Sequence, residues 1–371
     1  PKGTEKVITV KISAVPVCPT GCSGNVTVVI PDNGVRGVDE AGLQQYGASG
    51  LSGKYFTYSG SISATLTSGV ASDTPKDGVA IISANTDTEV ELAKFTAKAE
   101  DLDVVLKEVY LDIDEDGNAT ITASKLLSVK LYDGTTLVGA ANPDSSGYAS
   151  FTDLNVAISK DTTKTLVVKG VFDETAAGSS YQAKIRSGPN YGIRGEDVND
   201  NSVYDETARN GNKIYLYNKA PIIVLDSVQA VVRDDNATGG AETGEFTITF
   251  KATAKGGDIW ISNAATSTTS ATNGYITIVA EKGTTKQTSN AIILTSSVTA
   301  DPTWGYKVAE NTTETFTAKI TFENTGSADY VRGRIIGIAW NTSATSTGAV
   351  TWSADWAIDA LKTNYVYLTA N

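Results

Sequence analysis

Histidine is absent from this chain of 371 residues. Its absence excludes histidine-based catalytic triads, histidine general bases and histidine-rich metal sites. Pairs of carboxylates could still hydrolyse glycosidic bonds. The acidic residues, however, cluster in turn-forming stretches, and the sequence places no pair across a cleft. We therefore expect that the protein is not an enzyme.

Methionine is also absent, and the chain begins at Pro1. This combination predicts a mature, exported chain from which an initiator and any signal peptide have been removed. No apolar run approaches the ~18 residues of a membrane-spanning helix, so we expect no direct membrane insertion. The formal net charge of −12 opposes binding to a phosphate backbone, so we expect no nucleic-acid partner.

Cysteine occurs only twice, at Cys18 and Cys22, on either side of a Pro-Thr-Gly turn. This spacing predicts a disulfide that closes a small loop, with two free thiols as the alternative. A zinc site would need further cysteine or histidine ligands. A disulfide indicates an oxidising, extracellular location.

The chain contains an internal repeat. Seven residues recur 150 positions later, and a second block of six positions recurs, with identical or similar residues, 155 positions later. The first block is Thr162, Thr163, Thr165, Lys169, Phe172, Thr175 and Ile185 against Thr312, Thr313, Thr315, Lys319, Phe322, Thr325 and Ile335. The second is Phe95, Ala97, Ala99, Asp103, Val104 and Leu106 against Phe250, Ala252, Ala254, Asp258, Ile259 and Ile261. Because the blocks keep their order and have similar spacing, they indicate duplication of a whole domain.

Apolar and polar residues alternate with period two through most of the chain, and Asp-Gly, Asn-Gly and Lys-Gly turns separate the alternating runs. This pattern predicts an all-β fold with two tandem Ig-like antiparallel β-sandwich domains. We expect the domains at 61–218 and 219–371, with a linker at 219–221 where Pro221 interrupts the pattern. Residues 1–60 match neither copy and form an N-terminal extension that bears strands at 6–15 and 25–30. Within the first copy, the alternating pattern also predicts a strand at 119–123.

Two acidic stretches have the alternating oxygen ligands of calcium loops. At 112–118 the ligands would be the side chains of Asp112, Asp114 and Asp116. The stretch 197–206 resembles the Asp/Asn-rich calcium loops of secreted repeat and dockerin-like proteins. There the ligands would be the side chains of Asp197, Asn199, Asn201 and Asp205 and the carbonyl of Val203. Alanines stand where an EF-type loop carries its bidentate glutamate, so solvated hairpin turns are the alternative. Calcium is the only cofactor that we predict.

All five tryptophans fall in the second copy, at positions 260, 304, 340, 352 and 356. Sandwich cores and subunit contacts use such residues most often, and we predict that role for them. A platform that stacks on sugar rings, binding for example a cell-envelope polysaccharide, is the alternative.

Two terminal runs are candidate assembly strands. Near the N-terminus, residues 6–15 alternate, and Val7, Ile8, Val10 and Ile12 give this run its apolar content. Two strands make no stable core alone, so we predict that this run completes a sheet of this chain or of a neighbouring copy. At the C-terminus, Tyr365, Val366, Tyr367 and Leu368 predict a closing strand, which either pairs within the second sandwich or meets the next subunit, with the tryptophan cluster beneath it.

The paired blocks, threonine-rich strands and acidic turns resemble the Ig-like modules of prokaryotic surface-layer proteins, adhesins and extracellular filament subunits. The resemblance covers residues 61–371 and implies a location at the cell surface and a structural role. We therefore predict an exported, non-enzymatic subunit that polymerises with identical subunits into a filament or a surface-layer-like lattice. The alternative is a calcium-dependent adhesin or carbohydrate-binding protein.

Overall fold

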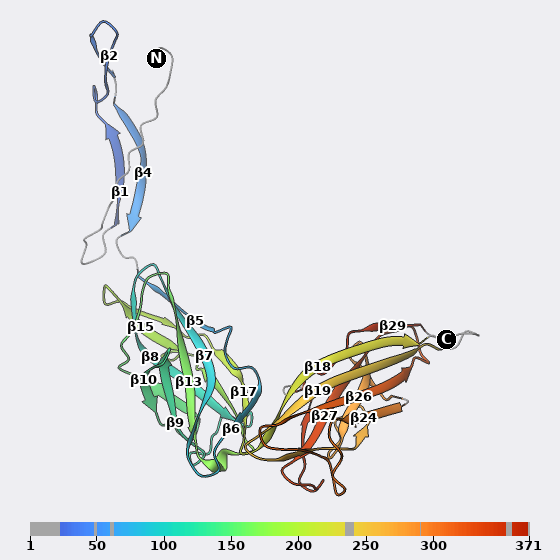
Figure 1. Ribbon diagram of the computed structural model, residues 1–371. Coiled ribbons are helices and arrows are strands. Elements are labelled where there is room, and N and C mark those ends of the chain that lie inside the picture. Colours follow the sequence, from blue (N-terminus) through green and yellow to red (C-terminus); the bar gives the residue numbers. More distant parts are fainter. Residues whose placement is uncertain are drawn as a thin grey trace.

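The computed structural model describes residues 23–47, 50–59, 63–233, 241–289, 291–353 and 358–369. These residues form β-strands and one 3-10 turn, η1 (Glu174–Ala176), without any α-helix. The predicted all-β fold is therefore confirmed. Its sheets build two sandwiches, preceded by a ribbon (Figure 1).

The ribbon consists of β1 (Ser23–Ile30) and β4 (Leu51–Ser59), which pair antiparallel. Between them lies a short hairpin of β2 (Arg36–Val38) and β3 (Gln44–Tyr46). Figure 1 shows the ribbon extending away from one end of the first sandwich, while the second sandwich lies at the other end. The three parts thus follow one another along the molecule in the order of the sequence.

The first sandwich has a sheet of order β10-β9-β13-β7-β5 and a sheet of order β16-β15-β8-β14-β17-β6, in which β11 and β12 also pair with β8. Inward-facing side chains of both sheets make one core that extends from Ala64 to Leu216. The strands are β5 (Thr65–Val70), β6 (Gly78–Ile81), β7 (Thr88–Glu100), β8 (Val104–Glu115), β9 (Leu126–Asp133), β10 (Thr136–Ala141), β11 (Tyr148–Phe151), β12 (Val156–Ile158), β13 (Thr163–Phe172), β14 (Ser180–Ile185), β15 (Ile193–Asp197), β16 (Ser202–Asp205) and β17 (Arg209–Tyr217).

The second sandwich has a sheet of order β18-β19-β26-β24 and a sheet of order β21-β22-β27-β20-β25, with β23 paired to β22 and with β28 and β29 paired to β27. Its separate core extends from Ala220 to Leu368. The strands are β18 (Ala220–Arg233), β19 (Thr243–Lys255), β20 (Ile259–Ile261), β21 (Ala265–Thr266), β22 (Ile276–Lys282), β23 (Thr285–Gln287), β24 (Ala291–Ser296), β25 (Tyr306–Val308), β26 (Thr313–Glu323), β27 (Asp329–Asn341), β28 (Val350–Ser353) and β29 (Val366–Leu368).

The two sandwiches pair their repeated blocks in the same register. In the first, β13 pairs with β7 so that Leu166 lies opposite Phe95. In the second, β26 pairs with β19 so that Phe316 lies opposite Phe250. Each residue of the second pair is the repeat equivalent of one in the first. The sequence repeat is therefore a repeat of strand pairing.

The turn that leads into each of these pairs is also repeated. The backbone N–H of Asp161 donates to the carbonyl of Ala99 at 2.9 Å, and that of Asn311 donates to the carbonyl of Ala254 at 2.9 Å. Asp161 and Asn311 have positive φ angles of 58° and 59°, a conformation that Asp and Asn tolerate better than most residues. The same chemistry thus builds the same turn twice.

Some expectations were wrong in detail. The sandwiches are not wholly antiparallel, because β17 pairs with β6 and β22 pairs with β21 in parallel. A strand expected at 119–123 is an irregular loop, because the Glu115 carboxylate accepts a hydrogen bond from the backbone N–H of Thr122 at 2.6 Å. The expected linker is only Asn218 and Lys219, since β18 begins at Ala220 and an edge strand tolerates proline at its start.

Candidate functional site

The ribbon and its hairpin bury none of their described side chains. From Thr27 to Lys54, every side chain that the structure describes is exposed or, at Val28 and Ile30, half-buried. Several of the exposed ones are large and apolar, including Val29 (57% exposed), Val38 (61%), Leu43 (63%) and Leu51 (62%). A two-stranded ribbon in water is only marginally stable. This segment therefore exposes large apolar side chains and has no buried core of its own among the described residues.

The stretch 197–205 forms a hairpin of β15 and β16, in which Ile193 lies opposite Asp205. Asp197 ends β15 and Asp205 ends β16, so the two residues lie at opposite ends of the hairpin, about 13 Å apart at the rise of a β-strand. The predicted convergence of their carboxylates on one cation is therefore wrong. Asn199 and Asn201 stay near Asp197 in the turn, and Val203 is buried.

These two carboxylates fasten the hairpin to β5. Asp197 accepts the backbone N–H of Ala64 at 3.2 Å, and Asp205 accepts both the backbone N–H and the hydroxyl of Ser68 at 2.7 Å. Although burial acts to raise the pKa of Asp205, hydrogen bonds from Thr207 and Ser68 hold it at about 2. The residues predicted as calcium ligands here act as a clamp on the edge of the first sandwich.

The stretch 112–116 belongs mostly to β8, with only Asp116 in the following turn. Asp114 forms an ion pair with Lys184 of the neighbouring strand, and Asp116 accepts the backbone N–H of Ser180 at 2.7 Å. Burial, and then the nearby Asp114 carboxylate, raise the pKa of Asp112. The predicted loop that wraps a cation is wrong, because Asp112 and Asp114 lie in the extended strand β8, where Asp114 is paired with Lys184, and only Asp116 lies in the turn. In the described ranges no group of three or more acidic side chains is placed to hold a metal.

Trp340 and Trp352 are buried where the two sandwiches meet. Their rings lie 5.4 Å apart, and Tyr217 of the first sandwich packs against Trp340 at 5.3 Å. The indole N–H of Trp352 donates to the Tyr217 hydroxyl at 3.4 Å, and the Asn218 amide donates to the carbonyl of Ile82 at 3.3 Å. The contacts of Tyr217 with Trp340 and Trp352 join the two units, and the Asn218 amide ties the linker to the first sandwich.

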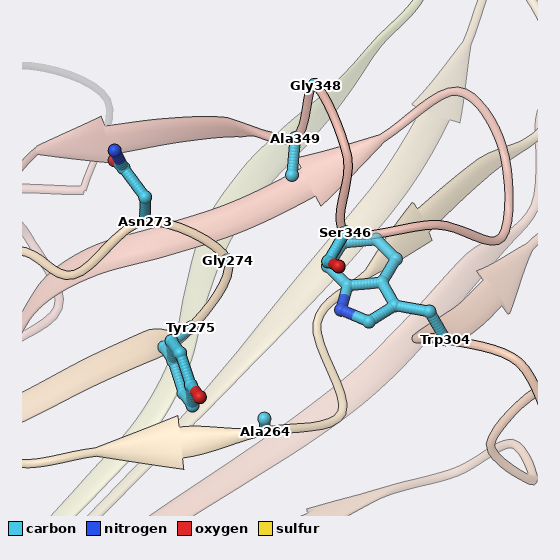
Figure 2. Close-up of a pocket in the computed structure, with 8 residues that line it drawn as sticks. All are labelled: Ala264, Asn273, Gly274, Tyr275, Trp304, Ser346, Gly348 and Ala349. Carbon is cyan, nitrogen blue, oxygen red and sulfur yellow. The ribbon is translucent and has the colours of Figure 1, made fainter.

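A shallow hollow of about 600 Å³ lies on the second sandwich, lined by Ala264, Asn273, Gly274, Tyr275, Trp304, Ser346, Gly348 and Ala349. Figure 2 shows the Trp304 and Tyr275 rings on opposite sides of it, with Ser346 beside the indole. Trp304 is half-buried and Tyr275 is exposed. Two aromatic rings, the amide of Asn273 and the hydroxyl of Ser346 thus line one hollow.

The C-terminal run contributes β29, which pairs with the start of β27 in the same subunit, Leu368 lying opposite Asp329. Leu368 is buried, Val366 is half-buried, and Tyr365 and Tyr367 are exposed. Trp340 lies at the other end of β27, roughly 30 Å away at the rise of a β-strand. The expectation that the tryptophan cluster lies beneath this strand is therefore wrong.

β18 is an edge strand that, among the described residues, pairs only with β19. Its inward-facing Val228 and Ala230 are half-buried, while the residues opposite them in β19, Ile248 and Phe246, are fully buried. Val232, the next inward position, is 37% exposed. The second core is thus incompletely covered along this edge.

Several predicted residues lie outside the described ranges: Val7, Ile8, Val10 and Ile12 of the N-terminal run, the pair Cys18 and Cys22, and Trp356. No pattern in the sequence predicts the carboxylate clamp on β5 or the half-covered edge at β18. Nothing local in the sequence reveals that Ala64 and Ser68 donate to Asp197 and Asp205 across more than 130 residues.

No family model matches this chain, and no curated protein matches it. Among solved structures, one titled "BspA_C_mut" is 8% identical and covers 84% of this chain and 99% of its own, with a TM-score of 0.22. A likeness at that TM-score supports no inference about function. No helix among the described residues has the length and hydrophobicity needed to cross a bilayer.

Proposed function

We propose that this protein is an exported structural subunit of an extracellular surface assembly, a filament or a lattice, that forms by contact between identical copies. The observation that carries this proposal is the ribbon: residues 27–54 form strands, yet none of their described side chains is buried. Because a lone two-stranded ribbon is marginal in water, a partner surface would stabilise it. Assembly supplies that surface.

The rest of the molecule supports the same role. The aromatic contacts of Tyr217 with Trp340 and Trp352 connect the sandwiches. This connection favours an elongated unit whose two sandwiches keep a fixed relative position. The absence of histidine from the sequence and the lack of converging carboxylates among the described residues favour structure over catalysis.

The test compares the full chain with a variant in which the exposed ribbon residues Val38 and Leu43 are replaced by aspartate. A matched control replaces the exposed polar Gln44 and Gln45 by aspartate, which adds the same charge to the same hairpin. We expect the wild type and the control to form polymers in negative-stain microscopy and light scattering, and the Val38/Leu43 variant to remain small. Polymers of equal length from all three proteins would contradict the proposal.

A second candidate function is that of an adhesin which binds cell-envelope polysaccharide, and the hollow with Trp304 and Tyr275 is the observation that favours it. Trp304→Ala should then abolish retention on immobilised polysaccharide, whereas Trp304→Phe should retain part of it. Calcium stays a prediction: the melting temperature with calcium and with a chelator would differ if a site exists. Equal retention of wild type and Trp304→Ala would remove this candidate.

A further inference from the structure

We propose that residues 227–233 of β18 in one copy accept residues 6–15 of a second copy as an added strand. This inference rests on the proposed function, because it names a contact, in addition to that of the ribbon, through which identical subunits would join. The acceptor is the half-covered edge of the second sandwich, and the donor is the alternating N-terminal run.

The acceptor is the part of β18 that follows its bulge. The register with β19 shifts between Leu225 and Ser227, so the two halves of the strand differ. The first half begins at the buried Ala220, close to the first sandwich. In the second half the inward positions Val228, Ala230 and Val232 are incompletely covered. An added strand there would pair with the free edge and cover the exposed side of the core.

The donor matches these positions in spacing. Ile8, Val10 and Ile12 recur every second residue, as do the three inward positions of the acceptor. Directly opposite residues of paired strands lie on the same face of a sheet. A register that sets Val10 beside Ala230 therefore points all three donor side chains toward the core. Ala230 is small, which leaves room for a larger neighbour.

The donor must come from another copy, because the residues that connect it to β1 are too few to let it reach β18 of its own copy. Residues 16–22, between the donor and the start of β1, extend over at most about 25 Å. β7, a strand of 13 residues and thus about 43 Å long, runs along the first sandwich. The Glu100 end of β7 lies opposite Thr65, on the side of the first sandwich that faces the ribbon. The Thr88 end lies near the junction between the two sandwiches. Figure 1 shows the whole first sandwich between the ribbon and β18.

Charge favours the same pairing. Residues 1–15 contain three lysines, Lys2, Lys6 and Lys11, and one acid, Glu5, so they carry a formal +2. Subtracting this from −12 leaves −14 on the rest of the chain. The donor is thus a basic segment that approaches an acidic body, which steers encounter between copies.

The test uses two full-length variants with the same charge change at adjacent positions, Val10→Asp and Thr9→Asp. Only Val10 lies on the apolar face. We expect Val10→Asp to raise the critical concentration for assembly at least tenfold and Thr9→Asp to change it less than twofold. In wild type, amide exchange at 227–233 should slow on assembly. An excess of a peptide with the sequence of residues 4–16 should cap growth.

The outcomes separate this inference from the proposed function. Wild-type polymers in which exchange slows at 291–296 of the opposite edge strand instead of 227–233 would overturn the acceptor and leave the function standing. Equal critical concentrations of the two variants would overturn the donor. A wild-type chain that stays monomeric at every concentration would overturn both the function and the inference.

Discussion

The edge strands β5 and β18 occupy the same place in the two sandwiches, each beside one strand of the repeated pair. They differ in how completely their inward-facing side chains are covered. On β5, Leu66 is only 3% exposed, because the β15–β16 hairpin lies over it and Asp205 holds Ser68. On β18, no described hairpin lies over the equivalent stretch, and Val228 and Ala230 stay half-buried. Duplication thus kept the central pairing and changed one edge, which is where a second copy can add a strand.

The largest expected effect tests whether the two sandwiches are separate folding units. Trp340→Ala removes a fully buried side chain of the second core and should cost about 3–5 kcal/mol. Since all five tryptophans lie in the second copy, tryptophan fluorescence during urea unfolding follows that sandwich and its contact with Tyr217. The mirror variant Phe172→Ala should leave the fluorescence transition in place. If both variants shift the fluorescence transition equally, the sandwiches unfold together. Their edge strands could then not be compared as parts of separate folding units.

Two leucine-to-alanine variants compare the covered edge strand β5 with the partly covered edge strand β18. Leu66→Ala in β5 should cost about 2–4 kcal/mol, since the side chain is fully covered. Leu225→Ala in β18 should cost about half as much, because that side chain is half-buried in the free subunit. Differential scanning calorimetry of both variants checks this. Equal losses would mean that β18 is as well covered as β5.

Acid should open the closed edge. The pKa of Asp205 is about 2 in the folded protein and 3.8 in its ordinary state. Because folding lowers it, the clamp contributes about 2 kcal/mol that is fully present above pH 4 and lost as pH falls through 2. Asp205→Asn should remove this contribution, and amide exchange at 65–70 would follow it. Wild type and Asp205→Asn with parallel stability curves between pH 5 and 2 would refute the clamp.

The smallest effect concerns the ion pair of Asp226 with Lys251 at the bulge of β18. Both side chains are well exposed, so Asp226→Asn should change the stability of the free subunit by less than about 0.5 kcal/mol. Urea unfolding of the unassembled protein measures it. A loss of several kcal/mol would show that the bulge, and with it the division of the edge into two halves, depends on this charge.

The sequence alone predicts the parts of the fold that depend on local pattern. The alternating runs around Phe95 and Leu166 and their repeats predict strands, and the repeat itself predicts that they pair twice. The expected strand at 119–123 fails because its threonine-rich pattern is overridden by the hydrogen bond to Glu115. The strand propensity of a segment indicates which structure it can form, and tertiary contacts determine which structure it adopts.

The candidate sites were harder to predict, because their partners are distant in the sequence. Asp197 and Asp205 have the spacing of a calcium loop, but spacing does not reveal that the chain between them forms a hairpin. Val228 is half-buried because no described strand lies over it. No residue near β18 in the sequence predicts this partial exposure. Only the ribbon was indicated in part, through the strand at 25–30, and its partner strand β4 was not.

A helical or lattice reconstruction of the assembled wild-type protein tests the central claim most directly. We predict a strand formed by residues 6–15 of one copy beside residues 227–233 of the next, with Ile8, Val10 and Ile12 facing the second core. A reconstruction in which that edge of β18 faces solvent, or in which residues 6–15 pack only on their own subunit, would contradict it.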